Sequence, residues 1–399
     1  MVVQSVYDFD PRVRRKAEAL VAAGYSVDVL SLRGDGGPKD YTLDGVNVST
    51  IGLGKKRGSL IRYAFEYFAF FMWTLVRVPL QMRRKQYAII DVNTLPDFLV
   101  FAPFIARWMG ARLVLDMHEI TPEFYISKYG IGADSWIVRA LKWQEKISFD
   151  FADHVITINE PVEDLLVSRG LPREKCTVMM NAADDARFAQ APAAAPAPDK
   201  FVMIYHGTLT RIYGLDLAIE AFGLVHQTMP GAELWILGSG PEKEGLAAVA
   251  RQAGVADKVK LVGQVPASEI PAWLSKSDVG ILPIRTDALL EFAFPNKLPE
   301  YIITGKAVII SRLKAIRHYF SEDSLAFAEP NNVKDLGRQM VRLYGDKKLR
   351  STLAANATRE YAPIRWDIMK RRYLDLVGQL AGAGEPAQQV VSGTRPVVR

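Results

Sequence analysis

The chain has 399 residues, 49% of them apolar and 24% charged, so it is long enough for two domains and too apolar for a disordered protein. The net charge of +6 comes without a recognisable nucleic-acid-binding motif, so we expect no nucleic-acid partner. The single cysteine, Cys176, excludes an intramolecular disulfide and a thiolate metal cluster, and the five histidines lack the spacing of metal ligands.

The first 32 residues have the pattern of a strand, a helix and a second strand. Asp10 and Pro11 supply an N-cap and a proline at the first helical position, and Gly24 ends the helix. The apolar residues of 26–32 form the next strand. This unit predicts an α/β domain with a doubly wound parallel sheet. No signal peptide is evident at the start of the chain, and together with the cysteine count this favours a cytoplasmic protein.

Residues 54–87 combine positive charge with aromatic side chains. They contain eight Lys or Arg residues against one acid, Glu66, and the uncharged run of residues 67–76 is too short to span a membrane. A helix of this kind suits the surface of an anionic membrane, which would place the protein on the inner face of the plasma membrane. The alternative is a helix that packs in the N-terminal domain and has a solvated basic end. Residues 46–51 are predicted as an antiparallel or edge strand.

A polar cluster follows the strand predicted at residues 112–116. His118 and Glu119 lie at its carboxyl end, which is the edge of a parallel sheet where functional groups gather. A lone histidine is more often structural, but the position of His118 beside acids favours a site.

The domain organisation is indicated by an Ala- and Pro-rich linker at residues 191–198. We predict an N-terminal domain, the linker, a C-terminal domain, a crossover helix and a disordered tail, over residues 1–187, 188–200, 201–365, 366–380 and 381–399.

The second half repeats the strand–loop–helix pattern with glycine at the loops. Gly207 follows the strand at residues 201–205, and Gly238 and Gly240 follow the strand at residues 233–237. Glycine lets a backbone approach a phosphate closely, and Arg211 is a cation in the first of these loops.

Residues 295–310 organise the second half of the chain. They predict a short helix that Gly305 ends and a buried strand after it. Lys297 in the first turn suits a diphosphate, since helix starts at the carboxyl edge of a parallel sheet attract phosphate. Glu300, one turn later on the same face, suits the two hydroxyls of a ribose.

These segments together resemble the retaining glycosyltransferases of family 4, over nearly the whole chain. The resemblance is carried by D-P-R-V-R at residues 10–14, D-x-H-E at 116–119, N-A-A-D at 181–184, G-T-L at 207–209, G-S-G-P at 238–241, G-x-V-P at 263–266 and P-N-K-x-x-E-Y at 295–301. It implies a GT-B fold, in which two Rossmann-like doubly wound domains face a cleft and a C-terminal helix crosses back to the N-terminal domain.

The resemblance also implies roles for individual residues. The nucleotide-sugar donor would be bound by Gly207, Arg211, Gly238, Gly240, Asn296, Lys297 and Glu300. The transferred sugar would be oriented by His118 and Glu291, and the acceptor would meet Asp10, Arg12 and Glu119. No metal and no cofactor are implied, because the nucleoside-diphosphate sugar is a substrate.

Two departures from the family pattern affect the donor site. Thr208 and Tyr213 occupy the places of an arginine and a lysine that usually contact the diphosphate. Phe292 occupies the place of the usual second acid, and Glu291 lies one residue away. The charge of the phosphates would then rest on Arg211, Lys297 and helix dipoles.

The sequence therefore predicts a retaining, metal-independent glycosyltransferase that acts on a saccharide or lipid-linked acceptor in envelope or exopolysaccharide synthesis. One alternative is a catalytically degenerate scaffold or binding subunit, which the changes at Thr208 and Tyr213 would explain. Another is a nucleotide-sugar epimerase, for which only His118 with Glu119 or Glu123 offers an acid/base pair.

Overall fold

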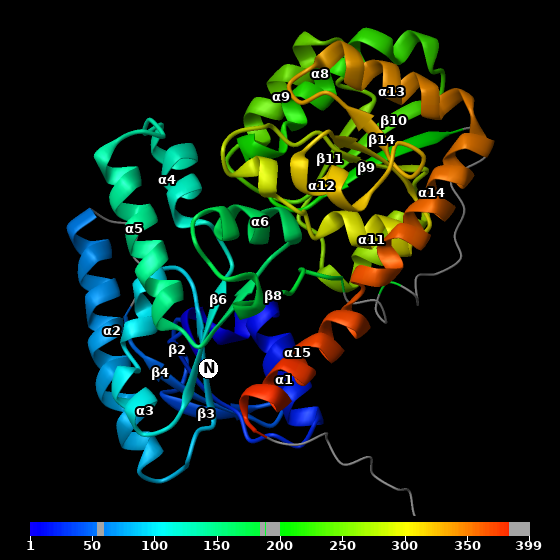
Figure 1. The fold of residues 1–399 in the computed structure, drawn as a ribbon. Helices are drawn as coiled ribbons and strands as arrows, with labels where there is room; N and C mark the ends of the chain where they lie inside the picture. The colour runs from blue at the N-terminus through cyan, green and yellow to red at the C-terminus, as the bar shows by residue number, and fades with distance from the viewer. Residues whose placement is uncertain (54–59, 184–187, 189–199, 383–399) are drawn as a thin grey trace, which may run out of the picture. The chain divides into compact units, whose positions relative to one another are not determined.

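The computed structural model describes residues 1–53, 60–183, 188 and 200–382, and its architecture is α/β with two sheets (Figure 1). Contacts between residues divide the chain into two compact units. The first contains residues 1–116, 151–154 and the chain from residue 370 onward, and the second contains residues 117–150 and 155–369. Most of the predicted linker and tail, together with Asp184 and the cations Lys55, Lys56 and Arg57, lie outside the described residues. The predicted domain boundaries stay a prediction.

The first sheet has eight strands in the order β3-β4-β2-β1-β5-β6-β7-β8. Its strands are β1 Val2–Val6, β2 Asp28–Leu32, β3 Asp40–Leu43, β4 Val46–Ile51, β5 Ile89–Asn93, β6 Arg112–Met117, β7 His154–Thr157 and β8 Cys176–Val178. β3 runs antiparallel to β4, whereas β4 pairs in parallel with β2. Of the two alternatives predicted for residues 46–51, the antiparallel pairing is confirmed and the edge position is wrong. The edge is β3, which the sequence analysis missed because its exposed and half-buried residues lack an apolar stripe.

Six α-helices are described in the first half of the chain. They are α1 Pro11–Ala22, α2 Leu60–Met82, α3 Phe104–Trp108, α4 Thr121–Tyr129, α5 Trp136–Phe151 and α6 Glu160–Ser168. Asp10 caps α1 as expected, because its side chain accepts a hydrogen bond from the backbone N–H of Val13. Between β5 and β6 the chain forms a 3-10 turn (Asp97–Phe101) and the short α3 rather than one continuous helix. Pro103 lies between them, and a proline lacks the N–H that a continuous helix needs.

The C-terminal helix α15 (Trp366–Leu380) brings its last turns into the first unit. The hydroxyl of Tyr373 donates a hydrogen bond to Asp91 Oδ2 at 2.8 Å. The same carboxylate oxygen lies 2.8 Å from Nζ of Lys16, which also contacts the carboxylate of Asp116. All four side chains are buried, so this charged cluster fastens the crossover helix to the first sheet, as the sequence predicted.

The second sheet has six strands, and every pairing in it is parallel. Its strands are β9 Phe201–His206, β10 Ala232–Leu237, β11 Val259–Gly263, β12 Val279–Leu282, β13 Ala307–Ser311 and β14 Ala326–Ala328. The order β11-β10-β9-β12-β13-β14 reverses direction between β9 and β12, which is the arrangement of a Rossmann-like domain. The predicted α/β class with doubly wound sheets is confirmed.

Helices cover the faces of this second sheet (Figure 1). They are α8 Leu215–Val225, α9 Lys243–Gln252, α10 Ile270–Ser275, α11 Lys297–Ile303, α12 Lys314–Tyr319, α13 Val333–Gly345 and α14 Lys347–Tyr361. β9 and β12, which are buried on both faces, form the middle of one apolar core. A parallel sheet covered on both sides leaves only its edges for binding, and the carboxyl edge at the reversal point is the usual place.

Candidate functional site

The candidate site is a cavity of about 410 Å³ at the carboxyl edge of the second sheet. The loops that follow β9, β10, β11 and β12 all contribute to it. Its lining includes His206, Gly207, Thr208, Leu237, Gly238, Ser239, Gln264, Val265, Asn296, Lys297 and Glu300. In the strand register His206 pairs with Leu237, so these loops leave the sheet at the same level. The cavity therefore lies where the topology predicts ligand binding.

The helix α11 presents two charged residues to this cavity because its other face is fixed in the core. Leu298, Tyr301 and Ile302 are buried, and the hydroxyl of Tyr301 donates to the backbone oxygen of Ile204 at 3.2 Å. Gly280 of β12 allows this packing, since a Cβ there would lie 2.5 Å from the Tyr301 ring.

The end of α11 matches the prediction for Gly305. This residue has a φ of +69°. The N–H of Gly305 donates to the oxygen of Ile302, and the N–H of Lys306 donates to that of Tyr301. These two bonds form the usual glycine-containing helix end.

Lys297 lies in an aromatic environment. Its Nζ is 4.1 Å from the centre of the Tyr213 ring and 5.2 Å from that of Tyr205. A Cβ at position 207 would lie 2.3 Å from Cε of Lys297, so Gly207 provides the room for this side chain. Burial lowers the pKa of Lys297 to about 8, although the nearby charge of Glu300 opposes the shift. Among the described residues no hydrogen bond or ion pair reaches its ammonium group.

Glu300 is paired with a histidine that the sequence analysis did not select. Oε2 of Glu300 lies 3.1 Å from Nε2 of His206, although the angle between them is not that of a hydrogen bond. The histidine is buried, and its ring contacts the ring of Tyr301 edge-to-face at 5.3 Å. The carboxylate of Glu300 is 20% exposed, so it retains access to the cavity. His206 is the last residue of β9, and this position at the carboxyl end of a strand was the available signal for it.

Gly238 and Gly240 were predicted to let the backbone approach a phosphate, but in the structure they allow close contact between two loops. A Cβ at Gly238 would lie 1.8 Å from the backbone oxygen of Gly207, and one at Gly240 would lie 2.2 Å from that of Leu209. These glycines therefore allow two loops to pack against each other, and Leu209 N–H donates to the oxygen of Ser239 there. Gly238 lines the cavity, whereas Gly240 does not.

Two residues of the predicted donor and sugar site lie elsewhere in the second unit. Arg211 is exposed and is absent from the cavity lining. Glu291 lines a separate cavity with Arg312, Lys314 and Arg317. Its two oxygens are engaged by the hydroxyl of Thr286 and by the backbone N–H of Lys314. The structure therefore brings Lys297 and Glu300 together with Asn296, Gly207 and Gly238, but not with Arg211 or Glu291.

The predicted acceptor residues follow strands of the first sheet. Asp10 is a structural cap, and its second oxygen accepts a hydrogen bond from the hydroxyl of Ser5 at 2.9 Å. The half-buried Arg12 has no hydrogen bond or ion pair to any described residue. His118 and Glu119 follow the end of β6, where His118 is buried. Both have partners in the fold.

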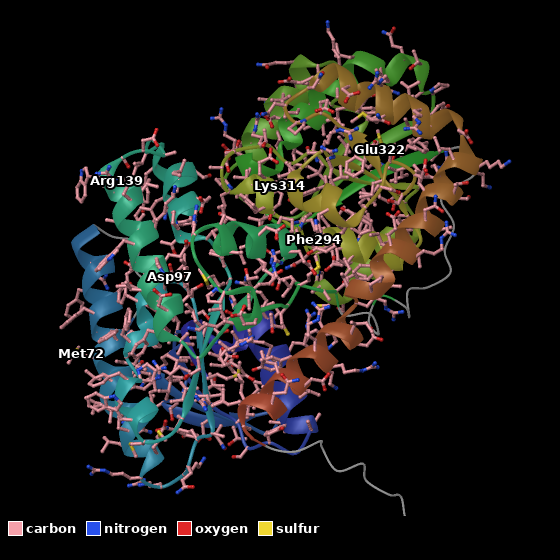
Figure 2. All side chains as sticks on the ribbon, in the orientation of Figure 1. Met72, Asp97, Arg139, Phe294, Lys314 and Glu322 are labelled. Carbon is pink, nitrogen blue, oxygen red and sulfur yellow. The ribbon has the colours of Figure 1, made fainter. Side chains whose placement is uncertain are left out.

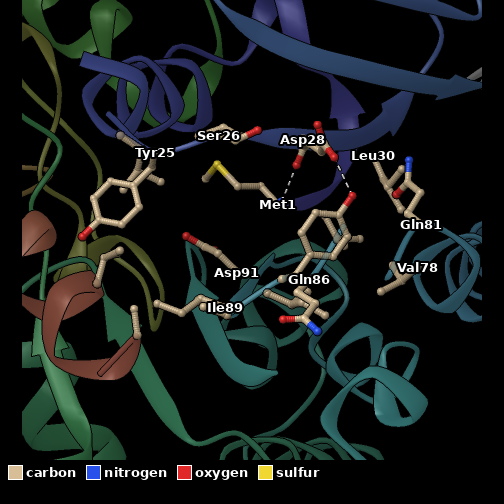
Figure 3. Close-up of a pocket in the computed structure, with 18 of the residues that line it drawn as sticks. Met1, Tyr25, Ser26, Asp28, Leu30, Val78, Gln81, Gln86, Ile89 and Asp91 are labelled. Carbon is tan, nitrogen blue, oxygen red and sulfur yellow. Dashed lines mark hydrogen bonds between the residues drawn. The ribbon is translucent and has the colours of Figure 1, made fainter. Parts of the chain in front are cut away.

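A second cavity, of about 280 Å³, lies in the first unit (Figure 3). It is lined by the first residues of β1, β2 and β5, and so lies at the amino edge of the sheet. The carboxylate of Asp28 in this cavity already accepts hydrogen bonds from Lys85, Tyr87 and Asn47. Burial would raise the pKa of Asp28, but these hydrogen bonds hold it below its usual value. This cavity has neither the position nor the free polar groups expected of the active site.

Metal and thiol chemistry have no evident centre in the described part of the chain. It contains no group of three or more His, Cys, Asp or Glu side chains suited to a metal ion. Burial raises the pKa of the Cys176 thiol to about 12, which makes it a poor nucleophile. The candidate site is therefore defined by Lys297, Glu300 and His206.

Comparison with family sequences gives two matches that divide the chain. A model described as glycosyl transferase 4-like domain matches residues 10–182, and one described as glycosyl transferases group 1 matches residues 200–346. WcaL of Escherichia coli (strain K12), a provisionally named colanic acid biosynthesis glycosyltransferase, is 31% identical over 178 residues. That match covers 43% of this chain and 43% of WcaL, so it spans less than half of the relative's length.

Solved structures share the fold over most of the chain. Sucrose-phosphate synthase from Thermosynechococcus elongatus superposes with a TM-score of 0.73 at 20% identity, covering 94% of this chain and 93% of the other. Anabaena HepE, determined in complex with UDP, superposes with a TM-score of 0.69 at 15% identity, covering 95% and 99%. At these identities the likeness shows the fold alone and leaves the chemistry to the residues described above.

Proposed function

Because this chain belongs to the group 1 glycosyl transferases and has the GT-B fold, we propose that it transfers a sugar from a nucleoside-diphosphate sugar to a saccharide or lipid-linked acceptor. The observation that carries this proposal is the pair of Lys297 and Glu300 in one cavity at the reversal point of the second sheet. The complexes of HepE with UDP support a nucleoside diphosphate as the ligand class.

Each residue of the cavity then has a role in holding the donor. Lys297 neutralises the diphosphate, and the carboxylate of Glu300 accepts hydrogen bonds from the ribose hydroxyls. His206 lies beside Glu300, with its Nε2 3.1 Å from Oε2 of the carboxylate. Positive charge aimed at the departing diphosphate stabilises the transition state, and Lys297 supplies that charge without a metal ion.

We propose that transfer retains the configuration of the sugar. The acceptor attacks the face that the diphosphate leaves, and the leaving phosphate oxygen takes the proton of the acceptor hydroxyl. His118 contacts the transferred sugar, by resemblance to the family. Glu291 takes no direct part in this account, because Thr286 and Lys314 already engage its carboxylate.

A thermal-shift screen tests the donor site. The purified protein is heated with UDP, GDP, ADP and their sugar conjugates, first without added metal and then with EDTA. We expect one nucleotide family to raise the melting temperature, because a ligand that binds only the folded state stabilises it. EDTA should leave the shift unchanged, and loss of the shift in EDTA would contradict metal independence.

Glu300→Ala provides the specificity control for that screen. This variant should lose the ligand-induced shift and keep the melting temperature of the free protein. The matched variant Glu244→Ala, which changes an exposed glutamate on α9, should behave like the wild type. A large drop in the melting temperature of Glu300→Ala alone would make Glu300 a structural residue.

For the acceptor we propose a lipid-linked or membrane-bound saccharide that is reached through helix α2. Among the described residues, no helix combines the length and the apolar content needed to cross a bilayer. One face of α2 is buried through Phe70, Val78 and Met82. The opposite face exposes an apolar stripe of Phe65 (62%), Phe68 (63%), Met72 (39%), Val76 (55%) and Leu80 (48%), and Figure 2 shows Met72 on the outer side of the helix.

The charges beside this stripe favour an anionic membrane as its partner. Arg83 and Arg84 follow the helix, are exposed and have no ion pair with any described residue. Anionic lipid headgroups would neutralise these arginines. This surface would place the protein on the cytoplasmic face of the membrane.

Vesicle sedimentation tests this surface. The double variant Phe65→Ser/Phe68→Ser should lose binding to vesicles that contain phosphatidylglycerol, and the wild type should bind vesicles of phosphatidylcholine alone weakly. Phe9→Ser, which changes an 83% exposed phenylalanine outside α2, is the matched control and should bind normally. A wild-type dimer in solution that the double variant disrupts would instead identify the stripe as a contact between copies.

Two rival functions make different predictions. A binding subunit without catalysis is favoured by Thr208 and Tyr213, and it would be indicated if no nucleotide shifts the melting temperature. An epimerase would need Glu119 or Glu123 as an acid/base partner of His118. Glu123 is engaged by Arg169, which also lies 2.9 Å from Glu145, so it is poorly suited to proton transfer.

A further inference from the structure

The position at which the family usually has a lysine is occupied by a tyrosine that contacts another lysine. Tyr213 replaces that lysine in the loop after β9, and its ring centre lies 4.1 Å from Nζ of Lys297. Tyr205 lies on β9, with its ring centre 5.7 Å from that of Tyr213 and 5.2 Å from the same Nζ. The negative faces of aromatic rings attract an ammonium group at such distances.

The loop that carries Tyr213 is held rigidly. Residues 211–213 form a 3-10 turn, and the N–H of Tyr213 donates to the oxygen of Thr210 at 3.1 Å. The backbone N–H of Arg285 donates to the oxygen of Ile212, which ties the turn to the segment after β12. Gly214 follows with a φ of +59°, and a Cβ there would lie 2.1 Å from the oxygen of Pro283. The backbone of Tyr213 is thus held by the fold, and its half-buried ring packs against the core of the second unit.

Lys297 is the one lysine or arginine among the described residues that line the cavity. Its side chain is half-buried, and the rings around its ammonium group supply attraction but no full negative charge. Arg211, the other available cation, is exposed and outside the lining. A dianionic group in the cavity would therefore find a single ammonium whose position is set by Tyr213, Tyr205 and Gly207.

We infer that Tyr213 is a positioning residue that holds Lys297 against the donor diphosphate, so that one half-buried lysine replaces the two cations the family usually uses. This inference rests on the proposed function of the cavity. Removal of the ring frees the long side chain of Lys297 to adopt other rotamers, and the ammonium then meets the diphosphate less often.

Isothermal titration of four proteins tests the inference: the wild type, Lys297→Met, Tyr213→Phe and Tyr213→Leu. Each is titrated with UDP, GDP and ADP and with the corresponding nucleosides, which lack the diphosphate. For the nucleoside diphosphate that the wild type binds, we expect Tyr213→Leu to weaken affinity about 10-fold and Tyr213→Phe to change it less than about 2-fold. Affinity for the nucleoside should not change in either variant.

A ring-shaped substitute covers the case in which Tyr213→Leu folds poorly. Trifluorophenylalanine at position 213 keeps the shape of the ring and removes the negative charge of its face. It should weaken diphosphate binding as Tyr213→Leu does. Equal affinity for phenylalanine and trifluorophenylalanine at this position would overturn the inference.

The remaining outcomes separate the inference from the proposed function. If Lys297→Met weakens binding and Tyr213→Leu does not, the inference is wrong and the donor site stands. If Tyr213→Leu weakens nucleoside and nucleoside diphosphate equally, the tyrosine acts on the fold of the cavity, and the inference is again wrong. If the wild type binds none of the three nucleotides, the proposed function and the inference fail together.

Discussion

Each unit contains a lysine withdrawn from the surface, Lys16 fully and Lys297 in part, and the surroundings of the two side chains differ in kind. Lys16 in the first unit contacts the carboxylates of Asp91 and Asp116, and the oxygen of Asn93 lies 3.3 Å from its Nζ. Lys297 in the second unit contacts aromatic rings and borders a cavity.

The pKa values of the two lysines move in opposite directions. Burial alone would lower both, but the carboxylates of Asp116 and Asp91 outweigh it and raise the pKa of Lys16. No such pair faces Lys297, whose pKa falls to about 8. A lysine that forms ion pairs with carboxylates of the protein stabilises the fold, whereas a lysine without such an ion pair is suited to bind an anionic ligand.

The largest predicted effect concerns the structural lysine. Lys16→Met leaves two carboxylates buried without their cation, and we expect the free energy of unfolding to fall by about 3–5 kcal/mol. Urea unfolding followed by circular dichroism measures this change. Lys348→Met, which alters an exposed lysine on α14, is the control and should unfold like the wild type. A loss as small as that of the control would mean that the cluster of Lys16 does not fasten the crossover helix.

The next effect concerns the ligand-binding lysine. Lys297→Met should weaken binding of the nucleoside diphosphate about 10- to 100-fold, which corresponds to one or two charge-assisted hydrogen bonds. Its free energy of unfolding should not decrease, because no ion pair with a described residue is lost. Titration calorimetry and urea unfolding of the same sample measure both. Lost stability with normal affinity would reverse the roles of the two lysines.

The pH dependence of nucleoside diphosphate binding is a further test of the role of Lys297. A bound diphosphate favours the charged form of Lys297, so affinity should be highest below about pH 8 and should fall as the pH rises through that value. Lys297→Met should remove this dependence between pH 7.5 and 9.5. A flat profile in the wild type would contradict the assignment.

The same lysines affect folding stability with opposite signs. The lowered pKa of Lys297 means that the unfolded chain binds more protons between about pH 8 and its ordinary value of 10.5, so its contribution to stability rises with pH there. The raised pKa of Lys16 contributes folding stability that is fully present below pH 10.5, its ordinary pKa, and that is lost only as the pH rises above this value.

The smallest effect is expected at Arg211. Because its side chain is exposed and outside the cavity lining, Arg211→Ala should change the affinity for the nucleoside diphosphate by less than about 3-fold. Calorimetry at low and at physiological salt measures the effect. A loss as large as that of Lys297→Met would show that the loop moves to bring Arg211 to the phosphates.

The sequence predicted local elements well where strong local signals exist. The start of α1 follows from Asp10 and Pro11, and the end of α11 follows from Gly305, because caps and left-handed glycines depend on a few adjacent residues. The crossover helix α15 has its predicted bounds. The strand β3 was missed because it lacks an apolar stripe, although the two-residue turn of Asp44 and Gly45 that joins it to β4 was a local signal for a hairpin.

The site could be predicted only in part, for the same reason. Lys297 and Glu300 share a cavity because they lie three residues apart on one helix face, which the sequence displays. The contact of Tyr213 with Lys297 joins residues 84 positions apart, and no local pattern encodes it. The direction of Glu291 was equally unpredictable, because it depends on how a short 3-10 turn (Leu290–Phe292) faces the start of α12.

The most direct test of the central claim is a crystal structure with the nucleoside diphosphate that stabilises the protein most. The account predicts a diphosphate oxygen within hydrogen-bond distance of Lys297 Nζ, the ribose hydroxyls on Glu300, and the ring of Tyr213 still against the lysine. A nucleotide bound elsewhere, or bound in this cavity with its phosphates away from Lys297, would contradict it.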